Sequence, residues 1–223
     1  MICRINIIIK GANIRIIYLF TNTSFVVFLF FFEKKRVLSS FEIDTFVWLN
    51  TMETLNKVKN KIVNKAQLIT QVNMWKKNNQ KIVFTNGCFD ILHRGHVEYL
   101  AQAADFGNKL IIGINTDISV KGLEKGSSRP IQDEYSRALL IASLEFVDAV
   151  ILFSESTPEL LIGSIIPNVL IKGGDYDPTC TNKQNKKYIV GSDIVKQNGG
   201  RVEVIQFVSG FSTTKIEEKI RKA

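Results

Sequence analysis

Short apolar runs and amphipathic segments alternate along the chain after residue 80. The apolar runs have the length and composition of buried strands, which we predict at 81–86, 109–115, 148–153, 168–172 and 201–207. Between these runs, apolar residues recur at helical spacing, which predicts helices from Val97 to near Gly107 and at 133–145, 157–164, 188–198 and 213–222. Strands that alternate with helices form parallel βαβ units. The pattern therefore predicts an α/β fold, a Rossmann-like open parallel sheet of about five strands with helices on both faces.

The residues before Met52 differ from the rest of the chain. Residues 16–32 carry no charged side chain and are followed by the basic flank EKKR at 33–36. This length is at the lower limit for crossing a bilayer. We interpret residues 1–51 as an apolar extension that is not part of the working protein, with Met52 as its natural start. The alternative is a membrane anchor at 16–32, and without it we expect no contact with a membrane. Residues 52–80 are predicted to form one or two helices that lead into the domain.

Charge and cysteine content narrow the classes of partner. The formal net charge is +8, but no long basic run occurs after residue 51, and nucleic acid is therefore not an expected partner. Cys3, Cys88 and Cys180 have no paired spacing, so neither a disulfide framework nor a zinc site is indicated. A cytoplasmic location fits this pattern best.

The segment that joins the first strand of the domain to its first helix carries the two histidines of the chain, His93 and His96. They stand three residues apart at a helix N-terminus, where exposed N–H groups favour phosphate. Two imidazoles in this position can donate hydrogen bonds to an α-phosphate as it gains charge, which is electrostatic stabilisation and not proton abstraction. The alternatives are two incidental surface residues or a metal pair. No third metal ligand is evident, so we expect no protein-bound metal.

The run GCFDILHRGH, residues 87–96, resembles the HxGH signature of the nucleotidyltransferase superfamily. Four further motifs follow in order: GINTD at 113–117, SRPI at 128–131 with Arg137 after it, KGGDY at 172–176, and GFSTT at 210–214. Together they resemble the D-glycero-β-D-manno-heptose 1-phosphate adenylyltransferases, the adenylyl-transferring half of a bifunctional heptose enzyme. The resemblance covers residues 81–222, so residues 81–223 are predicted to be a nucleotidyltransferase domain of the HxGH type.

The resemblance and the residue types together give a candidate site. Catalytic roles fall on His93 and His96. Nucleotide binding is expected of Asn86, Gly87, Cys88, Phe89, Asp90, Gly95, Lys172, Gly174, Asp175, Ser212, Thr213 and Thr214. Contacts to phosphate or the acceptor are expected of Asp117, Lys121, Arg129 and Arg137. Simpler structural readings stay open: a helix cap for 212–214, with Thr214 and Glu217 as a capping box, a polar turn for Lys172, and an Asx-turn cap for Asp117.

The reaction implied by the resemblance transfers AMP from ATP to the heptose 1-phosphate, with Mg²⁺, and yields ADP-heptose and pyrophosphate for lipopolysaccharide core synthesis. One alternative is a cytidylyltransferase that acts on glycerol 3-phosphate or a similar metabolite, and another is a non-catalytic nucleotide-binding module. The absence of a GxxxxGK[ST] loop disfavours a P-loop kinase. A homodimer is compatible with the superfamily. The polar loop at 177–187 departs from the family pattern, and it either influences acceptor choice, forms a lid, or is a tolerated insertion.

Overall fold

A computed structural model describes residues 53–122, 129–174, 176–208 and 210–222, together with the backbone of four strands near the N-terminus. The chain divides into two compact units, Met1–Asn56 and Lys57–Ala223. In the first unit the four strands form an antiparallel sheet in the order β1-β2-β3-β4. The strands are β1 Ile2–Ile9, β2 Ala12–Phe20, β3 Phe25–Phe31 and β4 Arg36–Val37. The segment 16–32, considered above as a membrane anchor, therefore contains the second half of β2 and all of β3.

No helix in the described part of the chain combines the length and the apolar character that crossing a membrane requires.

The second unit contains a five-stranded parallel sheet in the order β7-β6-β5-β8-β9. Its strands are β5 Ile82–Gly87, β6 Lys109–Asn115, β7 Ala149–Phe153, β8 Val169–Gly173 and β9 Arg201–Ile205. The chain runs outwards from β5 to β7 and then returns to place β8 on the other side of β5. Ligands bind at such a reversal of strand order, beyond the carboxyl ends of the strands. The predicted α/β class is confirmed, and β5 and β8 mark the place to look for a site.

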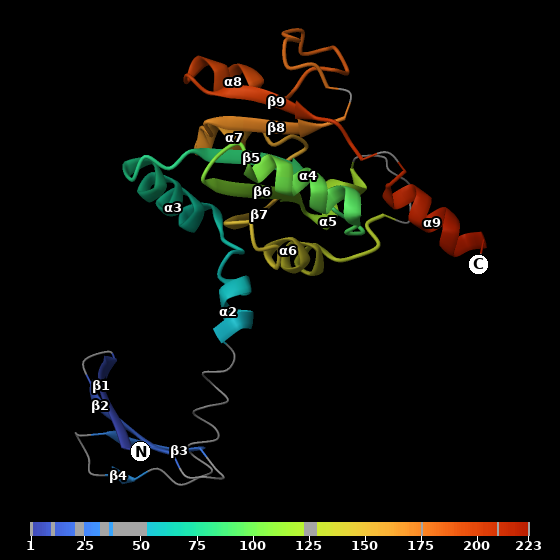
Figure 1. Ribbon diagram of the computed structural model, residues 1–223. Helices are drawn as coiled ribbons and strands as arrows, with labels where there is room; N and C mark the ends of the chain where they lie inside the picture. Colours follow the sequence, from blue (N-terminus) through green and yellow to red (C-terminus); the bar gives the residue numbers. More distant parts are fainter. Residues whose placement is uncertain are drawn as a thin grey trace. The chain divides into compact units, whose positions relative to one another are not determined.

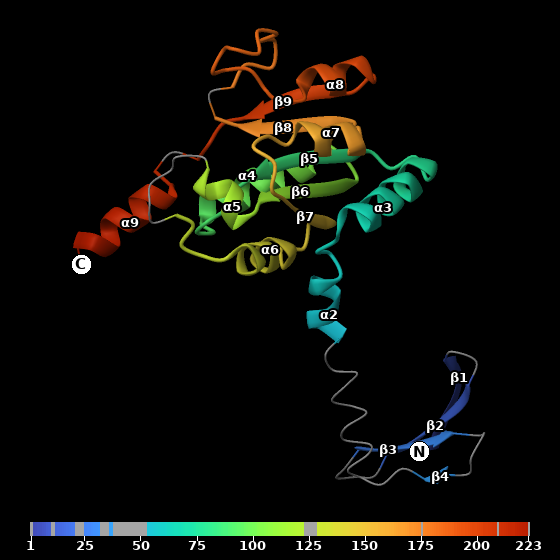
Figure 2. The ribbon, with the colours of Figure 1, turned by 180° about the vertical axis from the view of Figure 1, so that it is seen from behind.

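Helices cover both faces of this sheet (Figures 1 and 2). Helices α3 Lys65–Lys77, α7 Glu159–Ile165 and α8 Ser192–Gln197 pack on one face, and α4 Arg94–Ala104 and α6 Glu134–Ala142 pack on the other. The described part of the chain also contains the helices α2 Glu53–Lys59, α5 Asp117–Lys121 and α9 Thr213–Lys222. The segment predicted to hold one or two helices thus contains two, α2 and α3. The short helix α5 is absent from the sequence prediction. Its first turn is capped by Thr116, whose hydroxyl accepts a hydrogen bond from the Ser119 N–H.

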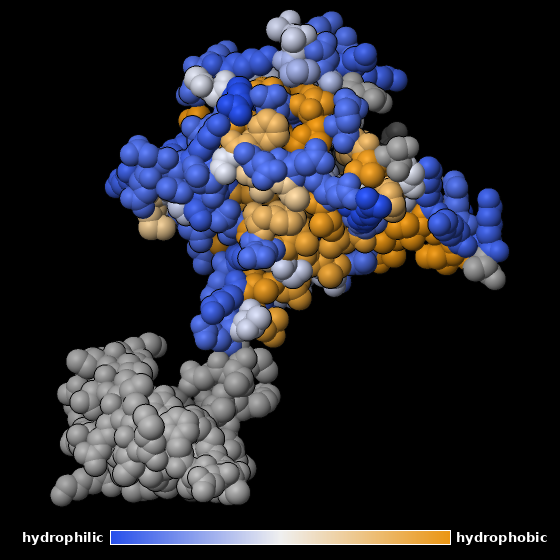
Figure 3. All heavy atoms as spheres, viewed as in Figure 1, coloured by the Kyte–Doolittle hydropathy of each residue, from blue (hydrophilic) through white to orange (hydrophobic). Residues whose placement is uncertain are grey.

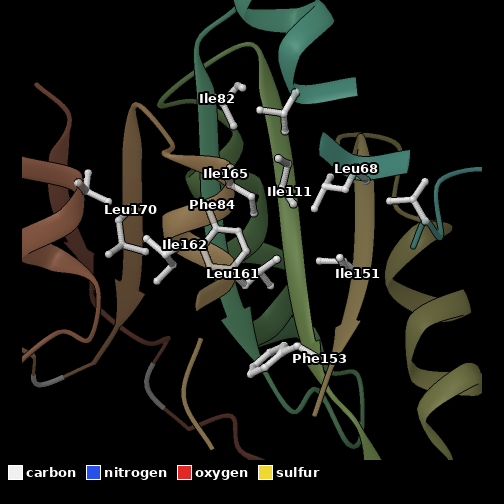
Figure 4. Packing of buried hydrophobic residues seen from close by; sticks show 14 of the residues in the cluster. Leu68, Ile82, Phe84, Ile111, Ile151, Phe153, Leu161, Ile162, Ile165 and Leu170 are labelled. Carbon is white, nitrogen blue, oxygen red and sulfur yellow. The ribbon is translucent and has the colours of Figure 1, made fainter. Parts of the chain in front are cut away.

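Two apolar clusters, one on each face of the sheet, form the core. Phe84 and Ile111 lie on the face covered by α3, α7 and α8, where they pack near Leu68 and Ile162 (Figure 4). Val83 and its neighbours on the opposite face pack against α4 and α6. Since the central strands are buried on both faces, their sequences are continuously apolar and do not alternate. That property made these strands recognisable in the sequence.

Apolar side chains are also visible from outside. In Figure 3 they gather along α6 and between it and α4, whereas α3 and the loop at 177–187 are mostly hydrophilic. Leu140 of α6 is one of the exposed apolar residues in this region. The hydrophilic loop stands beside the carboxyl ends of β8 and β9 (Figure 1), on the side of the sheet where ligands are expected.

Candidate active site

A cavity of about 540 Å³ opens at the carboxyl ends of β5 and β8, at the reversal of strand order. The end of β5 supplies Asn86, and the end of β8 supplies Lys172, whose ammonium group donates a hydrogen bond to the Asn86 side-chain oxygen. Ten of the predicted site residues line this cavity: Asn86, Gly87, Cys88, Phe89, Asp90, His96, Arg129, Lys172, Thr213 and Thr214. Segments from four distant parts of the sequence therefore meet at the predicted place.

The two histidines form a stacked pair at the start of α4. His93 is the N-cap residue, and its backbone is extended. Its ring lies 3.8 Å from the His96 ring, centroid to centroid, with 18° between the two planes. The His93 Nδ1 atom accepts a long hydrogen bond of 3.4 Å from the His96 backbone N–H, which leaves the ring proton on Nε2. His96 lines the cavity, whereas His93 does not line it and is stacked against His96.

The surroundings of both imidazoles favour the neutral form. Burial, together with a smaller effect of charge repulsion from His93, lowers the pKa of His96 to about 4, against a backbone hydrogen bond to Ile91 that favours the charged form. Burial also lowers the pKa of His93. A neutral imidazole still donates one hydrogen bond through its N–H. The pair can therefore stabilise negative charge that develops on a phosphate, without carrying a positive charge in the resting state.

Gly95 makes the stacked arrangement possible but does not line the cavity. A methyl group at Gly95 would lie 3.1 Å from the His93 ring and 3.1 Å from the Phe211 Cβ atom. Phe211 also lies under the Arg94 guanidinium, 5.2 Å from ring centroid to carbon. The missing side chain of Gly95 thus lets the start of α4 and the segment before α9 approach each other closely.

Asp90 lines the cavity and connects the segments around it. Its carboxylate is buried and accepts hydrogen bonds from the backbone N–H groups of Ile131 (2.8 Å) and Gln132 (3.1 Å). It also accepts one from Arg129 at 3.1 Å, and the other end of the Arg129 guanidinium lies 2.7 Å from Glu217 of α9. Arg129 therefore connects the loop after β5 with α9. Its side chain is mostly buried but still contributes to the cavity wall.

The start of α9 forms another part of the cavity wall. Thr213 and Thr214 line the cavity, and the Ser212 hydroxyl accepts a hydrogen bond of 3.2 Å from the Lys215 N–H. Ser212 is thus a helix cap and does not line the cavity. The predicted capping box of Thr214 with Glu217 is wrong, because helix α9 begins one residue before Thr214 and the Glu217 carboxylate is paired with Arg129.

Arg137 has a different role from the one predicted. The side chain is completely buried, and its three nitrogens donate to the Gln132 carbonyl (3.0 Å), the Cys88 carbonyl (2.6 Å) and the Asp117 carboxylate (2.7 Å). A guanidinium with these three acceptors is not positioned to bind phosphate. Arg137 instead fixes the loop after β5 to the start of α5, and Asp117 is its ion-pair partner.

The remaining predicted residues lie outside the cavity wall or outside the described residues. Lys121 is exposed at the end of α5. Gly174 has a φ of +88°, and its N–H donates to the Ile205 carbonyl at 3.0 Å, so it shapes the turn after β8. Asp175 lies outside the described residues. The conformation of Gly174 explains a glycine at this position, because other residues adopt positive φ values at a cost.

Five residues of the cavity wall were not among the predicted site residues: Tyr99, Val120, Gly173, Tyr176 and Phe207. Of these, Gly173 and Tyr176 belong to the KGGDY motif. Phe207 is 61% exposed and packs over the turn at Gly173, where an added methyl group would meet its ring at 2.3 Å. Burial raises the pKa of Tyr99 to about 12, and its hydroxyl is hydrogen-bonded to Thr85 at 2.7 Å. Phe207 was predicted to be the last residue of the strand at 201–207, but β9 ends at Ile205, so Phe207 lies in the segment that follows the strand.

The parallel sheet, the cavity at its switch point and the HxGH pair at a helix N-terminus together define a nucleotidyltransferase. A family model described as cytidylyltransferase-like matches residues 84–219, and the chain belongs to this family. The match includes most of β5, both histidines and most of α9. The family predicted from the HxGH run and the later motifs is therefore confirmed.

Two bifunctional proteins and one solved structure are similar to the chain. The chain is 46% identical over 177 residues to the bifunctional protein HldE of Campylobacter jejuni, covering 78% of this chain and 35% of the relative. It is 44% identical over 169 residues to bifunctional protein HldE of Koribacter versatilis, covering 76% and 33%. The chain thus spans about a third of the length of these relatives. A solved lipopolysaccharide core biosynthesis protein from Thermoplasma volcanium is 26% identical, with a TM-score of 0.44, and covers 58% of this chain and 97% of that one.

Proposed function

We propose that the chain transfers AMP from ATP to D-glycero-β-D-manno-heptose 1-phosphate and releases pyrophosphate, the reaction of the adenylyl-transferring half of a bifunctional heptose enzyme. The observation that carries the proposal is the cavity between two helix N-termini, with the neutral His93–His96 pair at one and Thr213–Thr214 at the other. Helix N-termini favour phosphate through their exposed N–H groups and partial positive charge. The bifunctional relatives and the order of the motifs support the choice of substrates.

The chemistry divides among residues of the cavity. The acceptor phosphate oxygen attacks the α-phosphorus of ATP, a new P–O bond forms, and the bond to pyrophosphate breaks. His96, with His93 stacked on it, donates to the α-phosphate oxygens as their charge increases. Thr213 and Thr214 hold the β- and γ-phosphates at the start of α9. Lys172 provides positive charge beside the reacting phosphate. No covalent intermediate on the protein is needed, since the residues act by positioning and charge stabilisation.

Mg²⁺ is proposed to enter with ATP as part of the substrate. Among the residues described by the structure, no group of three or more His, Cys, Asp or Glu side chains is placed to hold a metal ion. Asp90 lines the cavity, but its carboxylate already accepts two backbone N–H groups and Arg129. Mg²⁺ commonly keeps several waters and binds through substrate phosphates with few protein ligands. The residues present therefore fit an ion that is carried by the triphosphate.

The test is pyrophosphate release measured for each combination of ATP or CTP with the heptose 1-phosphate or glycerol 3-phosphate. Reactions without an acceptor serve as the control for hydrolysis. We expect rapid release only with ATP and the heptose 1-phosphate, and ADP-heptose as the second product. Turnover with CTP but not with ATP would overturn the choice of nucleotide. If the chain binds ATP but releases no pyrophosphate with any acceptor, it is a nucleotide-binding module.

A further inference from the structure

A second cavity of about 340 Å³ lies next to the nucleotide cavity. The two cavities share five wall residues at the ends of β5 and β8: Asn86, Gly87, Cys88, Lys172 and Tyr176. The second cavity extends from this shared wall towards the ends of β6 and β7, where Asn115 and the segment 156–158 line it. Its volume is within the range of small-molecule sites. The proposed function as described above uses only the first cavity.

The lining of the second cavity suits a polyhydroxylated anion. Ser156 and Thr157 bring two exposed hydroxyl groups, and Asn86 and Asn115 bring two side-chain amides. Lys172 of the shared wall adds a positive charge, and no carboxylate belongs to the described lining residues. Hydroxyls and amides both donate and accept hydrogen bonds, which matches the hydroxyl groups of a sugar. A sugar phosphate could place its ring among these groups and its phosphate beside Lys172.

The geometry of in-line transfer also favours the second cavity as the place from which the acceptor approaches. The attacking oxygen and the leaving pyrophosphate lie on opposite sides of the α-phosphorus. If the β- and γ-phosphates extend towards Thr213 and Thr214, the acceptor must approach from the other side of the α-phosphate. The shared wall at Asn86 and Lys172 is the place where a molecule in the second cavity would meet a nucleotide in the first.

The loop at 177–187 holds two walls of the second cavity together. Its base is closed by a hydrogen bond of 3.0 Å from the Asp177 N–H to the Lys187 carbonyl, and the residues flanking it, Tyr176 and Tyr188, both line the cavity. The Tyr188 hydroxyl donates to Asp193 at 3.1 Å. Tyr176 and Tyr188, one at each end of the loop, thus form an aromatic wall of the second cavity.

Lys183, within the loop, connects this aromatic wall with the hydroxyl wall. Its ammonium group lies 2.8 Å from the Asp193 carboxylate and 3.5 Å from the Glu159 carboxylate. Asp193 holds Tyr188, and Glu159 directly follows the lining segment 156–158. We propose that the second cavity is the acceptor subsite and that this loop sets its selectivity for the sugar, with Lys183 as a positioning residue. The inference rests on the proposed function, and it adds the place and the selectivity device for the acceptor.

The first experiment fills the cavity. Ser156→Phe adds a ring at an exposed lining position, and Ser154→Phe places the same ring at an exposed position that lines neither cavity. We expect Ser156→Phe to raise the KM of the sugar phosphate at least roughly tenfold, while the Kd of MgATP, measured without acceptor by calorimetry, stays within about twofold. Ser154→Phe should leave both unchanged. An unaltered acceptor KM in Ser156→Phe would overturn the assignment of the cavity.

A second pair of variants tests hydrogen bonding and the loop. Thr157→Val removes one hydroxyl with little change of shape, and the acceptor KM should rise roughly three- to tenfold, the effect of one lost hydrogen bond. Lys183→Met should raise the same KM without changing kcat or the Kd of MgATP, and Lys183→Arg should restore it. Lys186→Met, an exposed position in the same loop, is the matched control. A wild-type acceptor KM in Lys183→Met would refute the role of the loop.

The proposed function and this inference fail in different ways. If the wild-type chain uses another phosphorylated acceptor, the heptose assignment is wrong, but the same variants tested with that acceptor still decide whether the second cavity binds it. If the heptose 1-phosphate is the acceptor and Ser156→Phe binds it normally, the function stands and the cavity assignment falls.

Discussion

Replacing Arg137 separates a structural role from a phosphate-binding role. In Arg137→Met, an unbranched apolar side chain of similar length occupies the buried position, and the Asp117 carboxylate and the Cys88 and Gln132 carbonyls lose their donor. Breaking a buried ion pair by removing one partner costs about 3–5 kcal/mol. We therefore expect a large loss of stability in this variant, whatever its effect on ATP binding.

The loss of stability in Arg137→Met can be measured as a shift of the urea unfolding midpoint. With a loss of about 4 kcal/mol and a urea dependence of about 2 kcal/mol per molar, the unfolding midpoint should fall by about 2 M. Arg201→Met is the matched control, since Arg201 is exposed and contacts Glu203 and the Phe106 ring at the surface. Its midpoint should change by less than about 0.3 M. Urea unfolding followed by circular dichroism measures both variants.

The double variant tests the pairing itself. Asp117→Asn removes the carboxylate charge, and combining it with Arg137→Met should cost less than the sum of the two single changes, because both remove the same ion pair. The reasoning is refuted if Arg137→Met unfolds at the wild-type midpoint while its Kd for MgATP rises about tenfold. That result would mean that the guanidinium contacts phosphate and not the loop.

Three further predictions concern the histidine pair. His96→Ala should lower kcat for pyrophosphate release by about a hundredfold or more with an unchanged unfolding midpoint, since one charge-stabilising donor is lost; a kcat within about twofold of wild type would contradict this role. Gly95→Ala should reduce kcat roughly ten- to a hundredfold in the same assay, because the new methyl group displaces the His93 ring or Phe211 from contacts at 3.1 Å; normal kinetics would show that the pair tolerates displacement. The free energy of unfolding should fall as the pH is lowered from about 6.5 to about 4, since in this range the unfolded chain binds a proton at His96 that the folded chain does not. His96→Gln should flatten this part of the stability profile, and an identical profile in both proteins would refute the lowered pKa.

The sequence predicted the order of strands and helices well but not their arrangement in space. Continuous apolar runs such as 109–115 coincide with β6, because strands buried on both faces need no polar residues. The strand order β7-β6-β5-β8-β9 depends on the direction of each crossover, which no local pattern contains. Residues directly after β5 and β8 were nevertheless found, since any arrangement of parallel strands brings their carboxyl ends to one edge.

The errors in the site share a physical origin. Arg137 and Glu217 were interpreted from their immediate neighbours, as a phosphate ligand and a capping residue, but their partners lie far away in sequence at Cys88 and Arg129. A buried arginine is rare enough that exposure was the reasonable expectation. The second cavity was missed because Ser156 and Thr157 match no motif. They follow the carboxyl end of β7, however, and so satisfy the same rule that identified Lys172 at the carboxyl end of β8.

Helix α9 buries none of its side chains, yet its first turn forms part of the nucleotide cavity. The ion pair of Arg129 with Glu217, and Arg94 above the Phe211 ring, help to hold this region to the domain. Segments with few buried contacts open locally more often than the core. A triphosphate that binds there must also immobilise α9, so part of its interaction energy is used for ordering and not for affinity. Substitutions on the solvent-exposed side of α9 that raise or lower the stability of this helix should therefore change the affinity for ATP without contacting the nucleotide.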